Sequence, residues 1–283
     1  MSSEIISLTD WLKTPPGEYL LAWESARFDE AVADIFGFHA LQLGLNEMDT
    51  LRSNRIPHQW LALDSMQSTS ESAPGFTSNL SSGQPQSSRR VALLTHSAAL
   101  PFPANSLDLV VLPHTLELSH DPHATLREVE RVLVPEGRVV ISGLNPASLW
   151  GLRQQRAHLC QRLGFGELFL PQAGEFIGHW RLRDWLRLLS FDVESAHFGC
   201  YRPAIDKARW LGRFAWMDSA GARWWPIFGA VYFLVATKRV RGMRLLGPAW
   251  KDHAARVPAP AVVANRHQAR STSPSSLTDT TNS

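Results

Sequence analysis

The stretch "SLDLVVLPHTLELSHDPHATLREVERVLVPEGRVVISGL", residues 106–144, has the pattern of a strand, a helix and a second strand. Residues 106–113 form a continuous apolar run, as in a strand whose two faces are both covered by helices. Residues 121–137 repeat apolar side chains at helical spacing, and Asp121 is a suitable N-cap. Residues 138–144 are again apolar. Strand, helix and strand within about 40 residues predict a βαβ crossover, and therefore a parallel sheet.

The sequence on either side supplies more elements of the same kind. Apolar periodicity predicts helices over residues 18–36 and 179–191, and strands over residues 38–45, 58–64, 90–94, 191–199 and 230–240. The last two strands have no helix of clear pattern between them, so we expect them to pair antiparallel at the sheet edge. The predicted fold class is α/β, with roughly seven strands and helices on both faces of the sheet.

Composition divides the chain into parts. We expect one domain over residues 1–246, interrupted by a flexible insertion at 65–88, which holds nine serines and a single charged residue. Residues 150–180 follow the central strands and are a candidate lid or substrate cap. Residues 247–283 are polar and contain Pro and Ser, and we expect them to be a disordered tail.

Charge is unevenly distributed along the chain. The net charge of 283 residues is only +2, so the composition gives no general signal for nucleic-acid binding. Residues 1–150 hold 9 Lys and Arg against 17 Asp and Glu, whereas residues 151–256 hold 17 against 8. The basic second half indicates either a face for an acidic substrate, a membrane surface or a partner, or a plain solvated surface.

The sequence favours a protein of the cytoplasm. Cys160 and Cys200 form no disulfide framework and lack metal-ligand spacing, so we expect structural thiols and no metal site. The N-terminus lacks the basic and apolar regions of a signal peptide. Residues 224–237 are the longest apolar stretch and are shorter than the about 20 residues of a transmembrane helix.

Residues 100–142, "LPFPANSLDLVVLPHTLELSHDPHATLREVERVLVPEGRVVIS", resemble the class I S-adenosylmethionine-dependent methyltransferases, and in particular the small-molecule subgroup often called type 11. The shared features are LPF before the strand, H-x-L-E after it, the D-P helix start and the R-E-x-x-R-V-L helix. Three later segments resemble an uncharacterised bacterial branch of that superfamily: "GLNPASLWGLR" (143–153), "GEFIGHWRLRDWLRLLSF" (174–191) and "FGCYRP" (198–203).

The resemblance implies a Rossmann-like, seven-stranded sheet whose last strand is antiparallel. It also implies that S-adenosylmethionine binds across the carboxyl ends of the first strands, where such sheets bind ligands. In the family the first strand ends in an acidic residue and a glycine-rich loop. Here Gln42 takes the acidic position, Gly44 the position of the first glycine, and Leu45 adds a side chain where the family is bare.

The resemblance assigns further cofactor residues to the ends of the next strands. Asp64 ends the second strand, where a family carboxylate accepts the ribose hydroxyls, and its alternative is a solvated loop aspartate. Ser97 and Ala98 follow the third strand, at the adenine position, and their alternative is a plain turn. Pro113 ends the fourth strand, close to the transferred methyl group.

His114 directly follows Pro113, and it is the candidate general base because its reference pKa is close to neutral. The alternative is a packing or hydrogen-bonding histidine. Glu117 is expected to cap or orient the following turn. Four tryptophans in the second half, Trp210, Trp216, Trp224 and Trp225, are expected to pack in the core or in a cap rather than to bind a ligand.

Two functions are compatible with these residues. The first is an S-adenosylmethionine-dependent methyltransferase acting on a small molecule, which the basic second half allows to be anionic. The second is a methyltransferase-fold protein that has lost catalysis and serves as a binding or regulatory module, because the glycine loop is degenerate. A nicotinamide-dependent oxidoreductase would need G-x-G-x-x-G after the first strand, and the chain lacks it.

Overall fold

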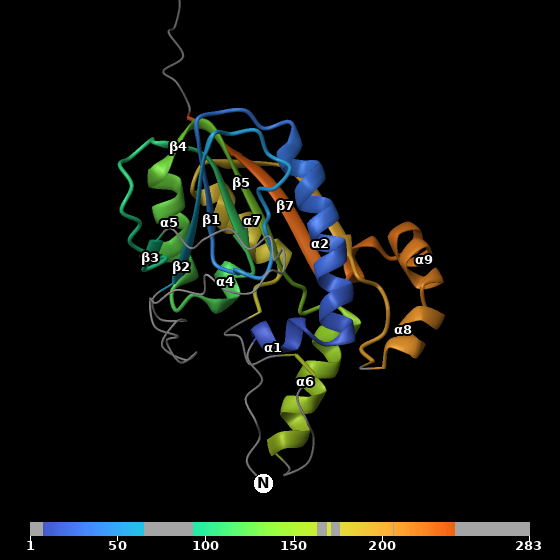
Figure 1. Ribbon diagram of the computed structural model, residues 1–283. Coiled ribbons are helices and arrows are strands. Elements are labelled where there is room, and N and C mark those ends of the chain that lie inside the picture. The colour runs from blue at the N-terminus through green and yellow to red at the C-terminus, as the bar shows by residue number, and fades with distance from the viewer. Residues whose placement is uncertain (1–7, 65–92, 163–168, 171–175, 206, 241–283) are drawn as a thin grey trace, which may run out of the picture. The chain divides into compact units, whose positions relative to one another are not determined.

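A computed structural model describes residues 8–64, 93–162, 169–170, 176–205 and 207–240 (Figure 1). Seven strands form one sheet in the order β3-β2-β1-β4-β5-β7-β6. The strands are β1 (His39–Leu43), β2 (His58–Asp64), β3 (Leu93–Thr95), β4 (Leu107–Pro113), β5 (Leu133–Leu144), β6 (Phe191–Gly199) and β7 (Val231–Lys238). The first five strands run parallel, and β7 runs antiparallel to both β5 and β6. The predicted α/β fold class and the antiparallel pairing at the edge are confirmed.

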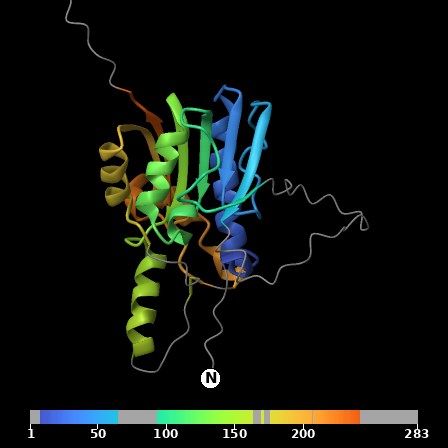
Figure 2. The same cartoon turned by 90° about the vertical axis from the view of Figure 1, so that its left-hand side faces the viewer.

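Helices cover both faces of this sheet. They are α1 (Leu8–Leu12), α2 (Pro15–Ala33), α4 (Thr115–Leu118), α5 (Pro122–Val132), α6 (Leu149–Arg162), α7 (His179–Leu188), α8 (Ala208–Arg213) and α9 (Trp216–Trp224), followed by the 3₁₀ helix η1 (Pro226–Phe228). In Figure 2, α5 lies in front of the sheet and α2 behind it, and α7 packs on the same face as α5.

Each face has its own apolar core. On one face α2 buries Leu20, Phe28 and Val32 against β4, β5 and β7. On the other face α5 and α7 bury apolar side chains, including Leu126 and Leu182, against the alternate residues of the same strands. Because both faces are covered, the central strands are apolar without interruption, as the run 106–113 predicted.

Several element boundaries differ from the sequence predictions. Helix α2 begins and ends about three residues earlier than 18–36, and Phe36, expected in its apolar stripe, is exposed. Helix α5 ends at Val132 rather than at 137, because the chain already pairs with β4 at Leu133. The strand register then shifts before Arg138, and Glu136 in between has a positive φ of 64°.

The second half departs most from the predictions. Two short helices, α8 and α9, lie in the connection between β6 and β7. The residues there show no clear helical periodicity of apolar side chains. The four tryptophans of this region are all exposed, so their expected packing in the core is wrong, while packing in a cap stays a prediction. Helix α6 forms the start of the candidate lid and projects beyond the carboxyl edge of the parallel strands (Figure 1). The predicted insertion and tail, 65–88 and 247–283, lie outside the described residues.

Candidate functional site

The end of β1 meets the start of α4 at very close range. Gly44 has φ +85°, and its amide donates to the carbonyl of Ala62 on β2 at 2.8 Å. A Cβ at this position would lie 2.9 Å from Oγ1 of Thr115, which itself donates to the carbonyl of Leu43. The single glycine of the loop is therefore required by its conformation and by this contact.

Gln42 forms a hydrogen-bonded network within the loop that follows β1. Its Nε2 donates to the carbonyls of Leu45 and Met48, each at 2.7 Å, and its Oε1 accepts from the amide and hydroxyl of Thr50. The side chain is fully buried. Gln42 thus stabilises the loop conformation with an amide, where the family pattern has a carboxylate.

Leu45 follows the glycine with a positive φ of 23°. Its side chain is buried in the apolar core on the α2 face, together with Met48. The Leu45 side chain, which stands where the family pattern has glycine, is therefore packed in the protein core. This arrangement removes the Leu45 side chain from the carboxyl edge of the sheet.

Asp64 lies at the end of β2, next to the segment after β3. Its carboxylate is buried, and Oδ2 accepts from the amide of Ser97 at 3.2 Å. Ala98 is partly exposed beside it, and its amide donates to Nδ1 of His96. The residues predicted at the second and third strand ends are therefore neighbours at the carboxyl edge of the sheet.

The hydroxyl of Ser97 belongs to a small hydroxyl cluster. It lies 3.2 Å from the hydroxyl of Ser119 and 3.3 Å from that of Thr125, and these two hydroxyls are 2.8 Å apart. The cluster joins the end of β3 to α4 and α5. The cluster could not be predicted from the sequence. Ser97 and Thr125 are 28 residues apart, and no known motif relates the three hydroxyl residues.

His114 occupies the end of β4, directly after the buried Pro113, with a left-handed backbone of φ 52°. Its Nε2 lies 3.0 Å from Oε1 of Glu24 on α2, and its Nδ1 lies 3.1 Å from Oε2 of Glu117 on α4. All three side chains are almost completely buried. Glu117 also accepts a hydrogen bond from the amide of Leu144 at the end of β5.

The two glutamates determine the protonation of His114. Burial alone lowers the pKa of the imidazole, but the negative charges of Glu24 and Glu117 outweigh it and raise the pKa to about 10. At neutral pH the imidazole is then a cation, with both ring nitrogens facing carboxylates. A general base must accept a proton, so this arrangement supports the packing and hydrogen-bonding interpretation of His114.

Glu24 was missed by the sequence analysis, although a signal was present. Leu20, Glu24, Phe28 and Val32 follow one another at a spacing of four, so Glu24 lies within the buried stripe of its helix. A carboxylate in such a stripe needs a buried partner of opposite charge. The sequence alone could therefore have indicated a cation opposite α2.

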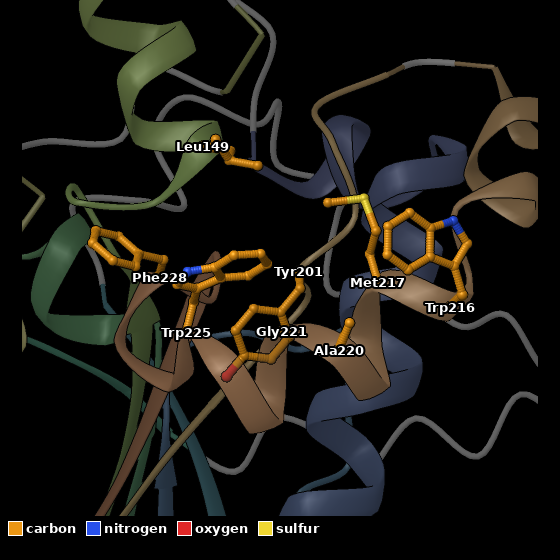
Figure 3. A pocket seen from close by; sticks show the side chains of 8 residues that line it. All are labelled: Leu149, Tyr201, Trp216, Met217, Ala220, Gly221, Trp225 and Phe228. Carbon is orange, nitrogen blue, oxygen red and sulfur yellow. The ribbon is translucent and has the colours of Figure 1, made fainter.

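An apolar pocket lies farther along the same edge, between the start of α6, the end of β6 and the α9–η1 segment. Its volume is about 330 Å³. Its walls are formed by Leu149, Tyr201, Trp216, Met217, Ala220, Gly221, Trp225 and Phe228, drawn in Figure 3. None of the predicted cofactor residues lines it.

The strand order and the residues at the carboxyl ends of the strands define the fold. A sheet of order 3-2-1-4-5-7-6 with β7 antiparallel, and with a glycine turn after β1 and a carboxylate at the end of β2, is the fold of the class I S-adenosylmethionine-dependent methyltransferases. Residues 54–141 match the family model described as a methyltransferase domain. The resemblance to this class, seen first in residues 100–142, is confirmed.

A segment of this chain also matches a bacterial protein. Over 94 residues the chain is 42% identical to the uncharacterised protein YafS of Escherichia coli (strain K12), covering 33% of this chain and 36% of that protein. The alignment thus spans about a third of that relative's length.

Solved structures share the fold at low sequence identity. A chain of the Haloferax volcanii complex with the Trm112 methyltransferase activator superposes with a TM-score of 0.50 at 15% identity, covering 83% of this chain and 97% of that chain. A Thermotoga maritima structure described as a SAM-dependent methyltransferase gives a TM-score of 0.48 at 15% identity, covering 78% and 95%. Among the described residues, no helix combines the length and apolar character needed to cross a bilayer.

Proposed function

We propose that this protein is an S-adenosylmethionine-dependent methyltransferase that acts on a small-molecule acceptor. One observation carries the proposal: the buried carboxylate of Asp64 and the positive-φ turn at Gly44 are neighbours on paired strands, with the Ser97 amide beside them. The positions that the resemblance assigns to the cofactor therefore meet at one edge of the sheet.

The residues present fit the cofactor. Asp64 supplies a carboxylate for the ribose hydroxyls, and hydrogen bonds to a charged acceptor contribute about 1.5–3 kcal/mol. The Leu45 side chain does not compete for the cofactor position, because it is packed into the core. The amides of Ser97 and Ala98 already donate to Asp64 and His96, so Ala98 offers the adenine its partly exposed apolar surface. S-adenosylmethionine has no pyrophosphate, so the chain needs fewer glycines than a dinucleotide-binding loop does.

When bound, the cofactor supplies a methyl group already activated on a sulfonium. The chain has to hold the acceptor in line with that group and exclude water. Pro113 and His114 begin the turn where the acceptor would approach, and the Glu24–His114–Glu117 ion pairs fix that turn. The assignment of His114 as the general base stays a prediction.

Because basic residues predominate in the second half of the chain, we propose an anionic acceptor. Arg153 and Arg156 lie on α6, in the candidate lid at the carboxyl edge. Arg153 already donates to the carbonyl of Ala204 and lies 4.3 Å from the ring centroid of Phe169. Arg156 is exposed, which makes it the better candidate to meet a carboxylate or a phosphate.

Isothermal titration of the full chain with S-adenosylmethionine and with S-adenosylhomocysteine tests the proposal. We expect dissociation constants below about 100 µM, corresponding to about 5.5 kcal/mol. Asp64→Asn should weaken binding about tenfold or more, because the neutral amide loses the charge-assisted bonds. Gly44→Val should abolish it. The exposed Asp184 on α7 provides the matched control, and Asp184→Asn should bind as the wild type does.

The second candidate function is a catalytically inactive binding or regulatory module. The observation in its favour is Gln42, whose amide is fully used inside the loop and offers the cofactor no carboxylate. Folded wild-type protein that binds neither ligand would refute the enzyme proposal and support this module.

A further inference from the structure

Residues 207–228, which contain α8, α9 and η1, present an unusual surface that we term the tryptophan face. Its tryptophans Trp210, Trp216, Trp224 and Trp225 are 46%, 62%, 71% and 58% exposed. Phe228 and Ile227 add further exposed apolar area. Large apolar side chains gathered on a surface mark a site that binds another molecule. The proposed methyl transfer makes no use of these side chains.

These side chains surround one opening. In Figure 3, Trp216 and Met217 stand on one side of the apolar pocket, Trp225 and Phe228 stand on the other, and Leu149 of α6 lies across from them. A cavity of about 330 Å³ with such walls accepts a hydrocarbon chain and offers few polar partners to a polar ligand.

The tryptophan face is held on a fixed base. The ring of Tyr201, which follows β6, packs so closely on Gly221 that a Cβ there would collide with it. The Tyr201 hydroxyl donates to the carbonyl of Pro226 at 2.8 Å. Helix α9 and η1 are therefore anchored to the sheet, and the exposed rings are presented by an ordered scaffold.

The acidic and basic side chains of this segment lie on different sides: the acidic one faces the protein, and the basic ones face solvent. Asp218, the single acidic residue among 207–228, accepts from Arg202 Nε at 2.9 Å and from the Tyr201 amide at 3.3 Å, on the side facing the protein. The cations Lys207, Arg209, Arg213 and Arg223 are exposed, and none of them pairs with a carboxylate among the described residues. The charge presented to solvent is therefore positive.

We infer that the tryptophan face binds the interfacial region of an anionic lipid bilayer. Indole rings prefer the headgroup boundary, because one edge is polar and the body is apolar. Arginine and lysine side chains extend to lipid phosphates while their stems cover apolar surface. Tryptophan and arginine are also enriched in protein interfaces, but a second copy of this positive face would bring like charges together, whereas anionic lipid neutralises them. The combination of exposed tryptophans and unpaired cations therefore fits a membrane surface.

The proposal describes a protein that lies on a membrane without crossing it. Helices α8 and α9 are too short to span a bilayer, and interfacial segments need only reach the headgroup and acyl boundary. The rings beside the pocket enter the lipid surface, and the pocket receives an acyl chain. This binding requires neither S-adenosylmethionine nor catalysis, so its test is independent of the proposed enzyme activity.

Flotation of the full chain with lipid vesicles tests the inference. Vesicles of phosphatidylcholine with about one third phosphatidylserine should carry the protein to the top of the gradient, and pure phosphatidylcholine vesicles should carry much less. Raising the salt to about 0.5 M should reduce binding to the anionic vesicles. The double variant Trp224→Ala/Trp225→Ala should bind the anionic vesicles about tenfold more weakly, because it removes two inserted rings.

Matched variants separate this surface from general effects. Trp180→Ala changes an equally exposed tryptophan on α7 and should bind as the wild type does. Arg209→Gln/Arg213→Gln/Arg223→Gln should lose the preference for anionic lipid. The variant Arg55→Gln/Arg127→Gln/Arg187→Gln removes the same charge elsewhere and should keep that preference.

Two results would overturn the inference. One is wild-type protein that remains unbound on both kinds of vesicle. The other is a concentration-dependent increase in molar mass in light scattering that the Trp224→Ala/Trp225→Ala variant loses, with no binding to vesicles. That second result would assign the tryptophan face to contact between two copies of the chain.

Discussion

At the scale of single residues, Gln42 explains how the degenerate loop is still well formed. Its amide nitrogen meets two carbonyls, and its oxygen meets two donors of Thr50, so the loop from 45 to 50 is stabilised by one side chain. A side-chain amide provides the two N–H donors and the acceptor that this network uses. A carboxylate at this buried position would lie opposite two carbonyl oxygens without a proton to offer them.

Gln42→Glu is therefore expected to destabilise the fold, although it would give the loop the acidic residue of the family pattern. The free energy of unfolding, measured in urea, should fall by about 2 kcal/mol or more, because two buried carbonyls lose their donor. The same change at the exposed Gln155, Gln155→Glu, should alter it by no more than about 0.5 kcal/mol. A Gln42→Glu protein as stable as the wild type would contradict the network described here.

The candidate site could be predicted from sequence wherever it depends on strand ends. Gly44, Asp64 and Ser97 each follow an apolar run, and parallel strands bring such positions to one edge. Their location was predicted, and their role in cofactor binding stays a prediction. Glu24 lies 90 residues before its partner His114, and no local rule couples two such positions. That pairing became visible only when the helix was packed against the sheet.

At the scale of elements, the loop after β1 is hydrogen-bonded to the C-terminal end of α2 through Asn54. Asn54 donates from Nδ2 to the carbonyls of Val32 at 2.6 Å and Ile35 at 3.0 Å, and its Oδ1 accepts from the amide of Ile56. The last carbonyls of a helix have no partner within the helix itself. The Val32 carbonyl also accepts from the Ile35 amide, so Asn54 adds a donor there, supplies one to the Ile35 carbonyl just beyond the helix, and joins the loop after β1 to α2.

Replacement of Asn54 by alanine tests this connection. Asn54→Ala should lower the free energy of unfolding by about 1–2 kcal/mol, because two buried carbonyls each lose a hydrogen bond. Hydrogen exchange should rise first in the last turn of α2. Arg55→Ala changes the exposed neighbour and should leave both quantities near their wild-type values. Equal effects of the two substitutions would show that Asn54 has no special role.

Elements with a face buried in the protein were predicted from the sequence, and elements without one were not. The strand 58–64 was predicted at its observed bounds because it is an apolar run between polar turns. The helix 121–137 was predicted too long, because the apolar residues after Val132 continue the pattern while already pairing with β4. Helices α8 and α9 gave no signal, since periodicity reports a face buried in the protein and theirs is largely open to solvent.

At the scale of the whole molecule, the buried ion pairs connect its layers. Glu24 belongs to the helix on one face, His114 and Glu117 follow the central strand β4, and Glu117 also binds the amide of Leu144 at the end of β5. Unfolding separates all of these groups and returns the imidazole to its ordinary pKa. The stability of the whole domain is therefore linked to the proton held by His114.

The sign of this linkage follows from the raised pKa. Folded His114 has a pKa of about 10, above the reference value of 6.5, so between these values the folded protein holds a proton that the unfolded chain releases. The contribution is fully present below about pH 6.5, and it is lost as the pH rises toward 10. Between pH 7 and 8.5 the free energy of unfolding should fall, with a slope approaching about 1.4 kcal/mol per pH unit from this group.

Urea unfolding across this pH range, with the variant Glu24→Gln beside the wild type, checks the prediction. The substitution keeps the shape of the side chain and removes one of the two negative charges that raise the pKa of His114. The folded pKa should move down, and the decline of stability between pH 7 and 8.5 should become shallower. Burial raises the pKa of the Cys200 thiol, so the unfolded thiol, with a reference pKa of about 8.5, adds a decline near the top of this window that is the same in both proteins. Parallel declines in the two proteins would show that His114 is not held as a cation between Glu24 and Glu117.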